Sequence, residues 1–77
     1  MTLDQLRYFQ TAAETLHVGK AAQIMNISQP SLSISIKKLE NELEVPLFEP
    51  SGRGITLTSY GEEFLPYVRS ILQQTEA

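Results

Sequence analysis

Residues 27–40 read ISQPSLSISIKKLE, and the period of this stretch decides what the chain can fold into. The letters LSISI alternate between apolar and polar residues, as in a half-buried β-strand. A strand would need that alternation to persist, and the sequence KKLE at residues 37–40 ends it. At about 100° per residue, by contrast, the apolar positions of residues 29–43 fall within one narrow sector of a helix. Those positions are Leu32, Ile36, Leu39 and Leu43. The helical period is therefore favoured.

The ends of this predicted helix also fit. Ser28 is a good N-cap, and Pro30 falls in the first turn, where a missing N–H costs little. The helix then has an outer face, away from the apolar sector, formed by Pro30, Ile34, Lys37 and Asn41. Ile34 is thus expected to be an apolar side chain in solvent, surrounded by Ser31, Ser33 and Lys37.

The rest of the chain predicts a mainly α domain with a small hairpin. Thr2 and Gln5 fit a capping box for a helix over residues 3–15. A short second helix is expected from Lys20 to Met25, ended by Asn26. Turn residues at 50–54 separate two short strands. The expected strands are residues 45–49 and 55–57, and a final helix follows, capped by Thr58 or by Ser59 with Glu62.

The final helix carries two apolar stripes, which implies two burial partners. One stripe is Tyr60, Phe64, Tyr67 and Ile71, and the other is Leu65, Val68 and Leu72. We expect the aromatic residues, together with Phe48, to lie in the core. The stripe of Leu65, Val68 and Leu72 is expected to bury a two-fold interface. The chain would then divide into a domain over residues 1–58 and a linker or dimerisation helix over residues 59–77, which continues in a longer protein.

Composition restricts the functions open to the chain. Its 77 residues suffice for one small domain that leans on a partner subunit. The chain has no cysteine and no apolar run long enough for a membrane span, which favours a cytoplasmic protein. The single histidine, His17, has no cluster of acids at ligand spacing, so we expect neither a metal nor another cofactor. No nucleophile motif or phosphate-binding loop is present, and we expect no enzyme.

Several residues of the chain, taken at their combined spacing, resemble the winged helix-turn-helix domain of LysR-type bacterial transcriptional regulators. They are Ala21-Ala22, Ser28-Gln29-Pro30, Ser33, Leu39-Glu40, Leu43, Leu47-Phe48, Leu57-Thr58 and Gly61. The resemblance covers nearly the whole chain without a gap. It implies a fold of three helices plus a two-stranded hairpin wing, followed by a long dimerisation helix. It also implies a homodimer whose two recognition helices enter successive major grooves of double-stranded DNA.

The resemblance further implies a tetramer for the intact protein and a C-terminal domain, absent from this chain, that binds a small-molecule inducer. RNA polymerase is a further candidate partner. The chain departs from the family's usual pattern at three informative positions. Many family members carry a basic residue at the position of Ile34, Arg at that of Pro50 and Gly at that of Glu44.

Within this resemblance, the outer face of the third helix supplies the candidate DNA contacts. Gln29 can pair its amide with an adenine edge, with Pro30 and Ser31 beside it, and Ser33 faces the backbone or a base. Ile34 can contact a thymine methyl group. Lysines can neutralise phosphates, and Arg53 between two glycines can enter a narrow minor groove. The lysines in question are Lys20, Lys37 and Lys38.

A different class of function is a winged-helix module that binds another protein. The net charge of −3 permits it. The location of the acids argues against it, because the outer face of the third helix bears lysines at its edge and no acid. The sequence therefore favours DNA binding.

Overall fold

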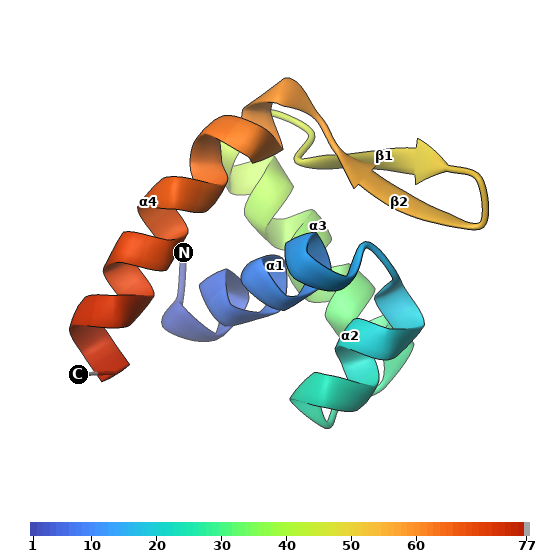
Figure 1. The fold of residues 1–77 in the computed structure, drawn as a ribbon, viewed down its shortest axis with the longest axis horizontal. Coiled ribbons are helices and arrows are strands. Elements are labelled where there is room, and N and C mark those ends of the chain that lie inside the picture. The colour runs from blue at the N-terminus through green and yellow to red at the C-terminus, as the bar shows by residue number, and fades with distance from the viewer. Residues whose placement is uncertain (77) are drawn as a thin grey trace.

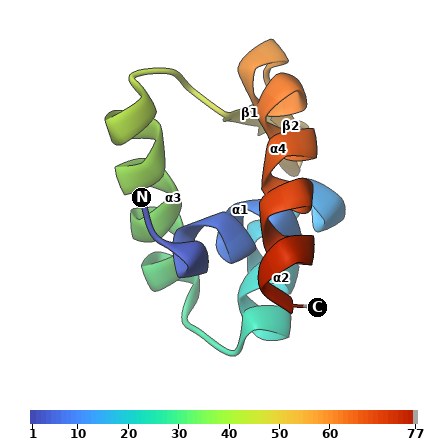
Figure 2. The same ribbon diagram turned by 90° about the vertical axis from the view of Figure 1, so that its left-hand side faces the viewer.

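The computed structural model describes residues 1–76. Within that range, four helices and one antiparallel hairpin follow each other along the chain (Figure 1). They are α1 (Leu3–Thr15), α2 (Val18–Met25), α3 (Gln29–Leu43), β1 (Phe48–Ser51), β2 (Gly54–Leu57) and α4 (Ser59–Glu76). In the turned view, α1 lies between α3 on one side and α4 on the other (Figure 2). The mainly α, winged architecture predicted from the sequence is confirmed.

Side-chain caps begin the helices where the sequence indicates. The capping box of Thr2 and Gln5 is present in both directions, so α1 starts as predicted. Ser28 Oγ accepts the backbone N–H of Ser31 at 3.2 Å, and Pro30 lies in the first turn of α3. α2 begins two residues earlier than predicted, because His17 Nδ1 accepts the N–H of Lys20 at 3.0 Å and caps it.

The hairpin and the start of α4 also differ in detail from the prediction. β1 begins at Phe48 rather than residue 45 and includes Pro50, which pairs with Ile55. Thr58, not Ser59, caps α4: its Oγ1 accepts the N–H of Gly61 at 3.2 Å. Thr58 Oγ1 also donates to the carbonyl of Pro46 at 2.6 Å, which ties the helix start to the loop after α3.

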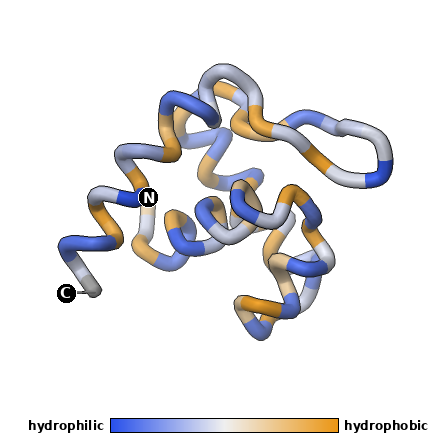
Figure 3. The backbone as a smooth tube through the Cα atoms, in the orientation of Figure 1, coloured by the Kyte–Doolittle hydropathy of each residue, from blue (hydrophilic) through white to orange (hydrophobic). Residues whose placement is uncertain are grey.

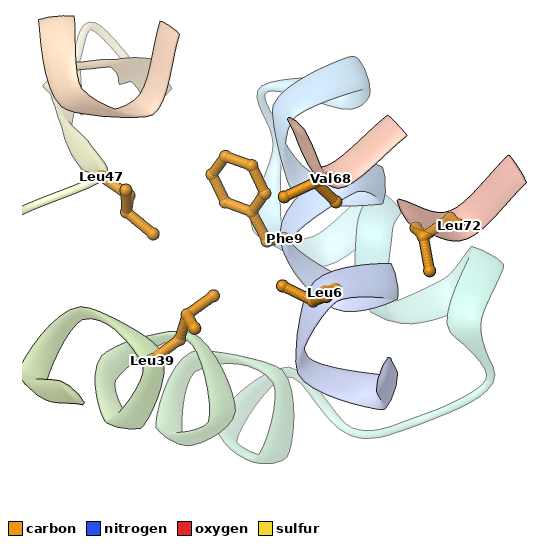
Figure 4. Packing of buried hydrophobic residues seen from close by; sticks show 6 residues of the cluster. All are labelled: Leu6, Phe9, Leu39, Leu47, Val68 and Leu72. Atoms are coloured by element: carbon orange, nitrogen blue, oxygen red, sulfur yellow. The ribbon is translucent and has the colours of Figure 1, made fainter. Parts of the chain in front are cut away.

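Phe9 of α1 is at the centre of the larger core cluster. Its ring lies 5.4 Å from that of Phe48 and 5.3 Å from that of Phe64, measured between ring centroids. Figure 4 shows the buried members of the cluster, which come from α1, α3, the α3–β1 loop and α4. They are Leu6, Phe9, Leu39, Leu47, Val68 and Leu72. α4 thus completes the core of the domain.

A second cluster joins α2 to α1 and α3. Its buried residues are Ala12, Ala21, Ala22, Leu32 and Ile36. Three of the five are alanines, whose small side chains let the helix backbones approach closely. The apolar sector of α3 deduced from the helical period is therefore confirmed as the buried face of that helix: Leu32 and Leu39 are fully buried.

The sequence assigned the stripe of Leu65, Val68 and Leu72 to the wrong partner, and of the aromatic residues expected in the core Phe48 and Phe64 are confirmed there, whereas Tyr60 and Tyr67 are not. Val68 is 0% exposed and Leu72 2% exposed, both within the monomer, and Leu65 is half-buried against the same core. Tyr60, Tyr67 and Ile71 are exposed instead, with Tyr67 at 69%. Val68 and Leu72 therefore cannot form the surface of a two-fold interface.

Gly61 explains why the stripe of Leu65, Val68 and Leu72 faces inward. Residues 61, 65, 68 and 72 share one side of a helix. A Cβ atom at Gly61 would lie 2.3 Å from the carbonyl oxygen of Leu47, so only glycine allows this side of α4 to approach the α3–β1 loop. The glycine at the head of the stripe is the sequence signal that identifies the inner face.

Three helices end on a non-glycine residue in the left-handed region. Leu16 has φ 53°, Asn26 has φ 58° and Glu44 has φ 60°. Asparagine tolerates this conformation, whereas a glutamate is strained there by roughly 1–2 kcal/mol. Glu44 therefore reduces the stability of the fold at the end of α3.

Replacing Glu44 with glycine should raise the free energy of unfolding by about 0.5–1 kcal/mol, after the entropy cost of glycine is subtracted. The corresponding rise in Tm is about 2–8 °C, measured by circular dichroism at fixed protein concentration. Asn26→Gly is the matched control and should change Tm by less. A lower Tm for Glu44→Gly than for the wild-type chain would contradict the strain at residue 44.

Candidate nucleic-acid interface

The outer face of α3 is exposed along its whole length. Seven of the predicted contact residues lie on this helix, and the structure brings them to one solvent-facing surface. All seven are exposed: Gln29, Pro30, Ser31, Ser33, Ile34, Lys37 and Lys38. Ser35, which lies beside them, is half-buried. Ser28 Oγ donates to Ser31 Oγ at 2.8 Å, which leaves the hydroxyl proton of Ser31 available for an external acceptor.

Two carboxylates near this face are held away from it or paired. Glu40 Oε2 accepts the N–H groups of Leu47 at 2.6 Å and Phe48 at 3.2 Å, so its charge points into the α3–β1 loop. Glu42 pairs with the N-terminal ammonium group of Met1 at 2.6 Å. Glu44 is exposed beside Lys37 and Asn41 at the C-terminal end of the helix. The part of the outer face that is free of carboxylates therefore runs from Gln29 to Lys38.

The distribution of charged residues along the sequence also indicates where an acid-free surface lies. From Thr15 to Leu39 the chain has three lysines and no aspartate or glutamate. This segment covers all of α2 and most of α3. Its local positive charge, in a chain of net charge −3, marks the surface to which a polyanion would be attracted.

The N-terminus of α2 lies next to the start of α3. A Cβ atom built at Gly19 would lie 3.1 Å from His17 Cε1 and 3.6 Å from Gln29 Oε1. The imidazole of His17, the amide of Gln29 and the first turn of α2, which also carries exposed Lys20, therefore form one surface. From the sequence, His17 is considered only as a possible metal ligand, and this proximity is missed, because it depends on how α2 packs on α3.

In its capping role, His17 keeps Nδ1 free of a proton, because Nδ1 accepts the N–H of Lys20. The ring proton of the neutral form is then on Nε2, where it can donate to an external oxygen. Backbone N–H groups at a helix N-terminus favour an anion, and Lys20 adds a full positive charge. This end of α2 suits a phosphate.

The hairpin is held to the end of α1 through β2, and its turn is open to solvent. Ile55 donates its N–H to the carbonyl of Leu16 at 3.2 Å, and a Cβ atom at Gly54 would lie 2.6 Å from that oxygen. Gly52 has φ +57°, and a Cβ atom added there would meet no other atom within 4 Å, so the turn is open to solvent. Arg53 is exposed between the two glycines. The turn is hydrophilic to neutral, as Figure 3 shows.

A separate apolar surface lies along α4. The exposed stripe of Tyr60, Tyr67 and Ile71 borders a groove of about 240 Å³. The groove is lined by Leu43, Val45, Leu47, Tyr60, Glu63, Phe64 and Tyr67. α1 lies between α4 and α3, which separates this surface from the outer face of α3 (Figure 2).

Two other kinds of site are absent from residues 1–76. That part of the chain has no cluster of three or more histidine, aspartate or glutamate side chains able to hold a metal ion. None of its helices combines the length and the apolar character needed to cross a membrane.

Comparison with known proteins places this geometry in a family. The family model described as bacterial regulatory helix-turn-helix protein, lysR family, matches residues 3–62. The chain is 50% identical over 74 residues to YybE, an HTH-type transcriptional regulator of Bacillus subtilis, and the match covers 96% of this chain and 25% of that protein. The chain thus spans about a quarter of the length of this curated relative.

Solved structures agree with the sequence comparison. The complex of the CbnR DNA-binding domain with DNA superposes with a TM-score of 0.94 at 39% identity, covering 99% of this chain and 87% of that one. The complex of the BenM domain with catB site 1 DNA gives 0.94 at 37% identity, covering 99% and 84%. The chain belongs to the LysR family of bacterial regulatory helix-turn-helix proteins and has its winged helix-turn-helix fold.

Proposed function

We propose that this chain is the DNA-binding domain of a LysR-type transcriptional regulator and binds specific double-stranded DNA as a homodimer. α3 enters the major groove and the hairpin lies near the minor groove. The observation that carries the proposal is the outer face of α3, on which small polar side chains and two lysines face solvent with no carboxylate before Glu40. Both of the solved structures compared above are complexes with DNA, which supports the same interpretation.

The exposed side chains of α3 have different roles in this proposal. Gln29, at the first position of the helix, reads a base edge through its amide, which can pair with both N6 and N7 of adenine. Pro30 fixes the helix start beside it, and Ser33 donates to a base edge or a phosphate. Lys37 and Lys38 hold the phosphates that flank the groove.

Two further elements contact the DNA backbone on either side of α3. Lys20 and the capped N-terminus of α2 bind a phosphate. Arg53 at the tip of the hairpin inserts into the minor groove, where a narrow A/T-rich groove has the most negative potential. The hydrogen bond from Ile55 to Leu16 holds β2, close to the turn that carries Arg53, to the segment before α2, so both contacts move with one rigid unit.

The homodimer forms through the exposed stripe of α4. Its exposed residues are Tyr60, Tyr67 and Ile71, and half-buried Phe64 lies between them. The four follow each other at spacings of four, three and four residues, the pattern of a helix seam that packs on another helix. A two-fold interface uses the same patch on both copies. The occupant of the apolar groove beside the stripe is then α4 of the second copy, since Tyr60, Phe64 and Tyr67 belong to both surfaces.

The remaining properties of the intact protein follow from this assignment. The relatives that the chain matches are transcriptional regulators about four times its length. In this proposal the domain is their DNA-binding module and acts without a catalytic step or a cofactor. A small-molecule inducer binds a further domain of the longer protein, which is a cytoplasmic tetramer and has RNA polymerase as a partner. The winged-helix module for protein contact is the competing function.

A DNA-binding experiment distinguishes sequence-specific DNA binding from a protein-interaction function. A site is first selected from random-sequence duplexes, and its affinity for the chain is then measured across a salt series. Binding driven by phosphate contacts should weaken with a log–log slope of roughly −0.9 per neutralised phosphate. A protein-interaction module would select no DNA sequence and would show no measurable affinity for duplex DNA at any salt concentration.

Lys37→Ala should lower the affinity for all duplexes alike and reduce the steepness of the salt slope by about 0.9 for each lysine lost, because one phosphate contact per protomer disappears. Arg69→Ala is the matched control, since Arg69 is an exposed cation on α4. An unchanged slope for Lys37→Ala, or an equal change for Arg69→Ala, would exclude α3 as the phosphate-binding helix.

A further inference from the structure

Ile34 is an unusual residue on the outer face of α3. Its side chain is 57% exposed, whereas Leu32 and Leu39 on the same helix are fully buried. Ile34 therefore adds nothing to either core cluster. Among the described residues of α3, it is the one large apolar side chain classed as exposed.

The neighbours of Ile34 leave its methyl groups uncovered. One turn toward the N-terminus are Pro30 and Ser31, which are short, and one turn toward the C-terminus are Lys37 and Lys38, which are long and charged. The side chain of Ile34 is thus a large apolar group of this face that remains more than half exposed. It lies between the end of the helix that carries Gln29 and the end that carries the two lysines.

We propose that Ile34 contacts the 5-methyl group of a thymine in each half-site and so determines the base that α3 accepts at that position. The proposal rests on the proposed function. Thymine displays the one methyl group among the four base edges of the major groove. Isoleucine has no donor or acceptor, so over another base it would cover polar groups without pairing them. The methyl contact with thymine and the unpaired polar groups of the other bases therefore both favour thymine.

The position of the thymine follows from helix geometry. Ile34 is five residues after Gln29, a rise of about 7.5 Å along α3. Successive bases on one strand are about 3.4 Å apart. The thymine should therefore lie within about two or three base pairs of the base that Gln29 reads.

The test uses the site selected from random duplexes with the wild-type chain. Each thymine of one half-site, and its symmetry mate, is replaced by uracil, which lacks only the methyl group. At one symmetric pair of positions, the wild-type affinity should fall by about fourfold per half-site, the value expected for one buried methyl group. Selected half-sites without a thymine would overturn the proposal.

The same duplexes are then measured with Ile34→Ala. This variant should bind the thymine duplex more weakly than the wild type and should be indifferent to uracil at the critical pair, because the two changes remove one shared contact. Ile24→Ala is the matched control: Ile24 is 64% exposed but belongs to α2. It should keep the full response to uracil, about fourfold per half-site.

The outcomes distinguish this proposal from the function on which it rests. A wild-type chain that binds its selected site but ignores uracil, or an Ile34→Ala variant that keeps the wild-type response, overturns the role of Ile34 alone. An Ile34→Ala variant with unchanged DNA affinity does the same. A chain that selects no duplex overturns the proposed function as well.

Discussion

Replacing Gly61 with alanine is expected to lower the free energy of unfolding by about 2–4 kcal/mol, as overpacking against a rigid backbone does. The added Cβ atom would lie 2.3 Å from the carbonyl oxygen of Leu47 and 2.7 Å from Leu57 Cδ2. That carbonyl cannot move freely, because it accepts the N–H of Thr58 at 3.0 Å. For a domain of this size the fall in Tm is more than about 10 °C, measured by circular dichroism.

Gly52→Ala is the control for this substitution. Gly52 has φ +57° but no atom within 4 Å of the added Cβ, so the change adds backbone strain without a clash. Its expected cost is about 1 kcal/mol. Equal losses of stability for the two variants would show that α4 does not approach the α3–β1 loop as closely as the structure has it.

The double variant Tyr67→Glu, Ile71→Glu is expected to fold as a monomer and to lose about 100-fold or more in affinity for the selected duplex. Both side chains are exposed in the single chain, so glutamate there costs the fold little. In the dimer they would face the second copy, where a charge without a partner is unfavourable. Separation of the two recognition helices removes the gain from joint binding, which is commonly 10²–10⁴-fold. Light scattering gives the mass, and the duplex titration gives the affinity.

Val68→Glu provides the contrast within the same helix. Val68 is 0% exposed in the monomer, so a glutamate there would bury a charge and unfold the domain. A Tyr67→Glu, Ile71→Glu variant that remains a dimer, or a Val68→Glu variant that folds as a stable monomer, would reverse the assignment of the two stripes.

The elements that the sequence predicts well depend on local interactions. The period of residues 29–43 identifies both the length of α3 and its buried face, since Leu32, Ile36 and Leu39 are all buried. The caps at Thr2 and Ser28 are decided within a single turn of backbone, and both are present. The exposed position of Ile34 follows from the same period.

The features that the sequence misses depend on contacts between distant segments. Both stripes of α4 are apolar, and periodicity alone cannot tell which one faces the core. The contact of Gly61 with Leu47 decides it. The same holds for His17, whose ring lies near Gln29 only because α2 packs across α3. The division at residue 58 stays a prediction, although Val68 and Leu72 show that α4 shares the core of the preceding helices.

Part of the candidate site follows from the helical period. The outward direction of Pro30, Ile34 and Lys37 needs no tertiary information once the helix is established, and all three are exposed. The same period places Gln29 beside the buried sector, and its exposure follows from its position at the start of α3. The orientation of Glu40 does need it: its carboxylate is held by two backbone N–H groups of the α3–β1 loop. That arrangement keeps a negative charge away from the surface proposed for DNA.

The most direct test of the central claim maps where α3 lies on DNA. The chain has no cysteine, so Ser33→Cys provides a single attachment point for an iron chelate that cuts nearby DNA strands. Two α3 helices in successive major grooves predict two centres of cleavage in the selected duplex, about 10 base pairs apart or a multiple of that distance. The same chelate at Ser70→Cys, an exposed position on α4, should give no cleavage centres. Cleavage from residue 70, or none from residue 33 on a duplex that the labelled protein still binds, would contradict the account.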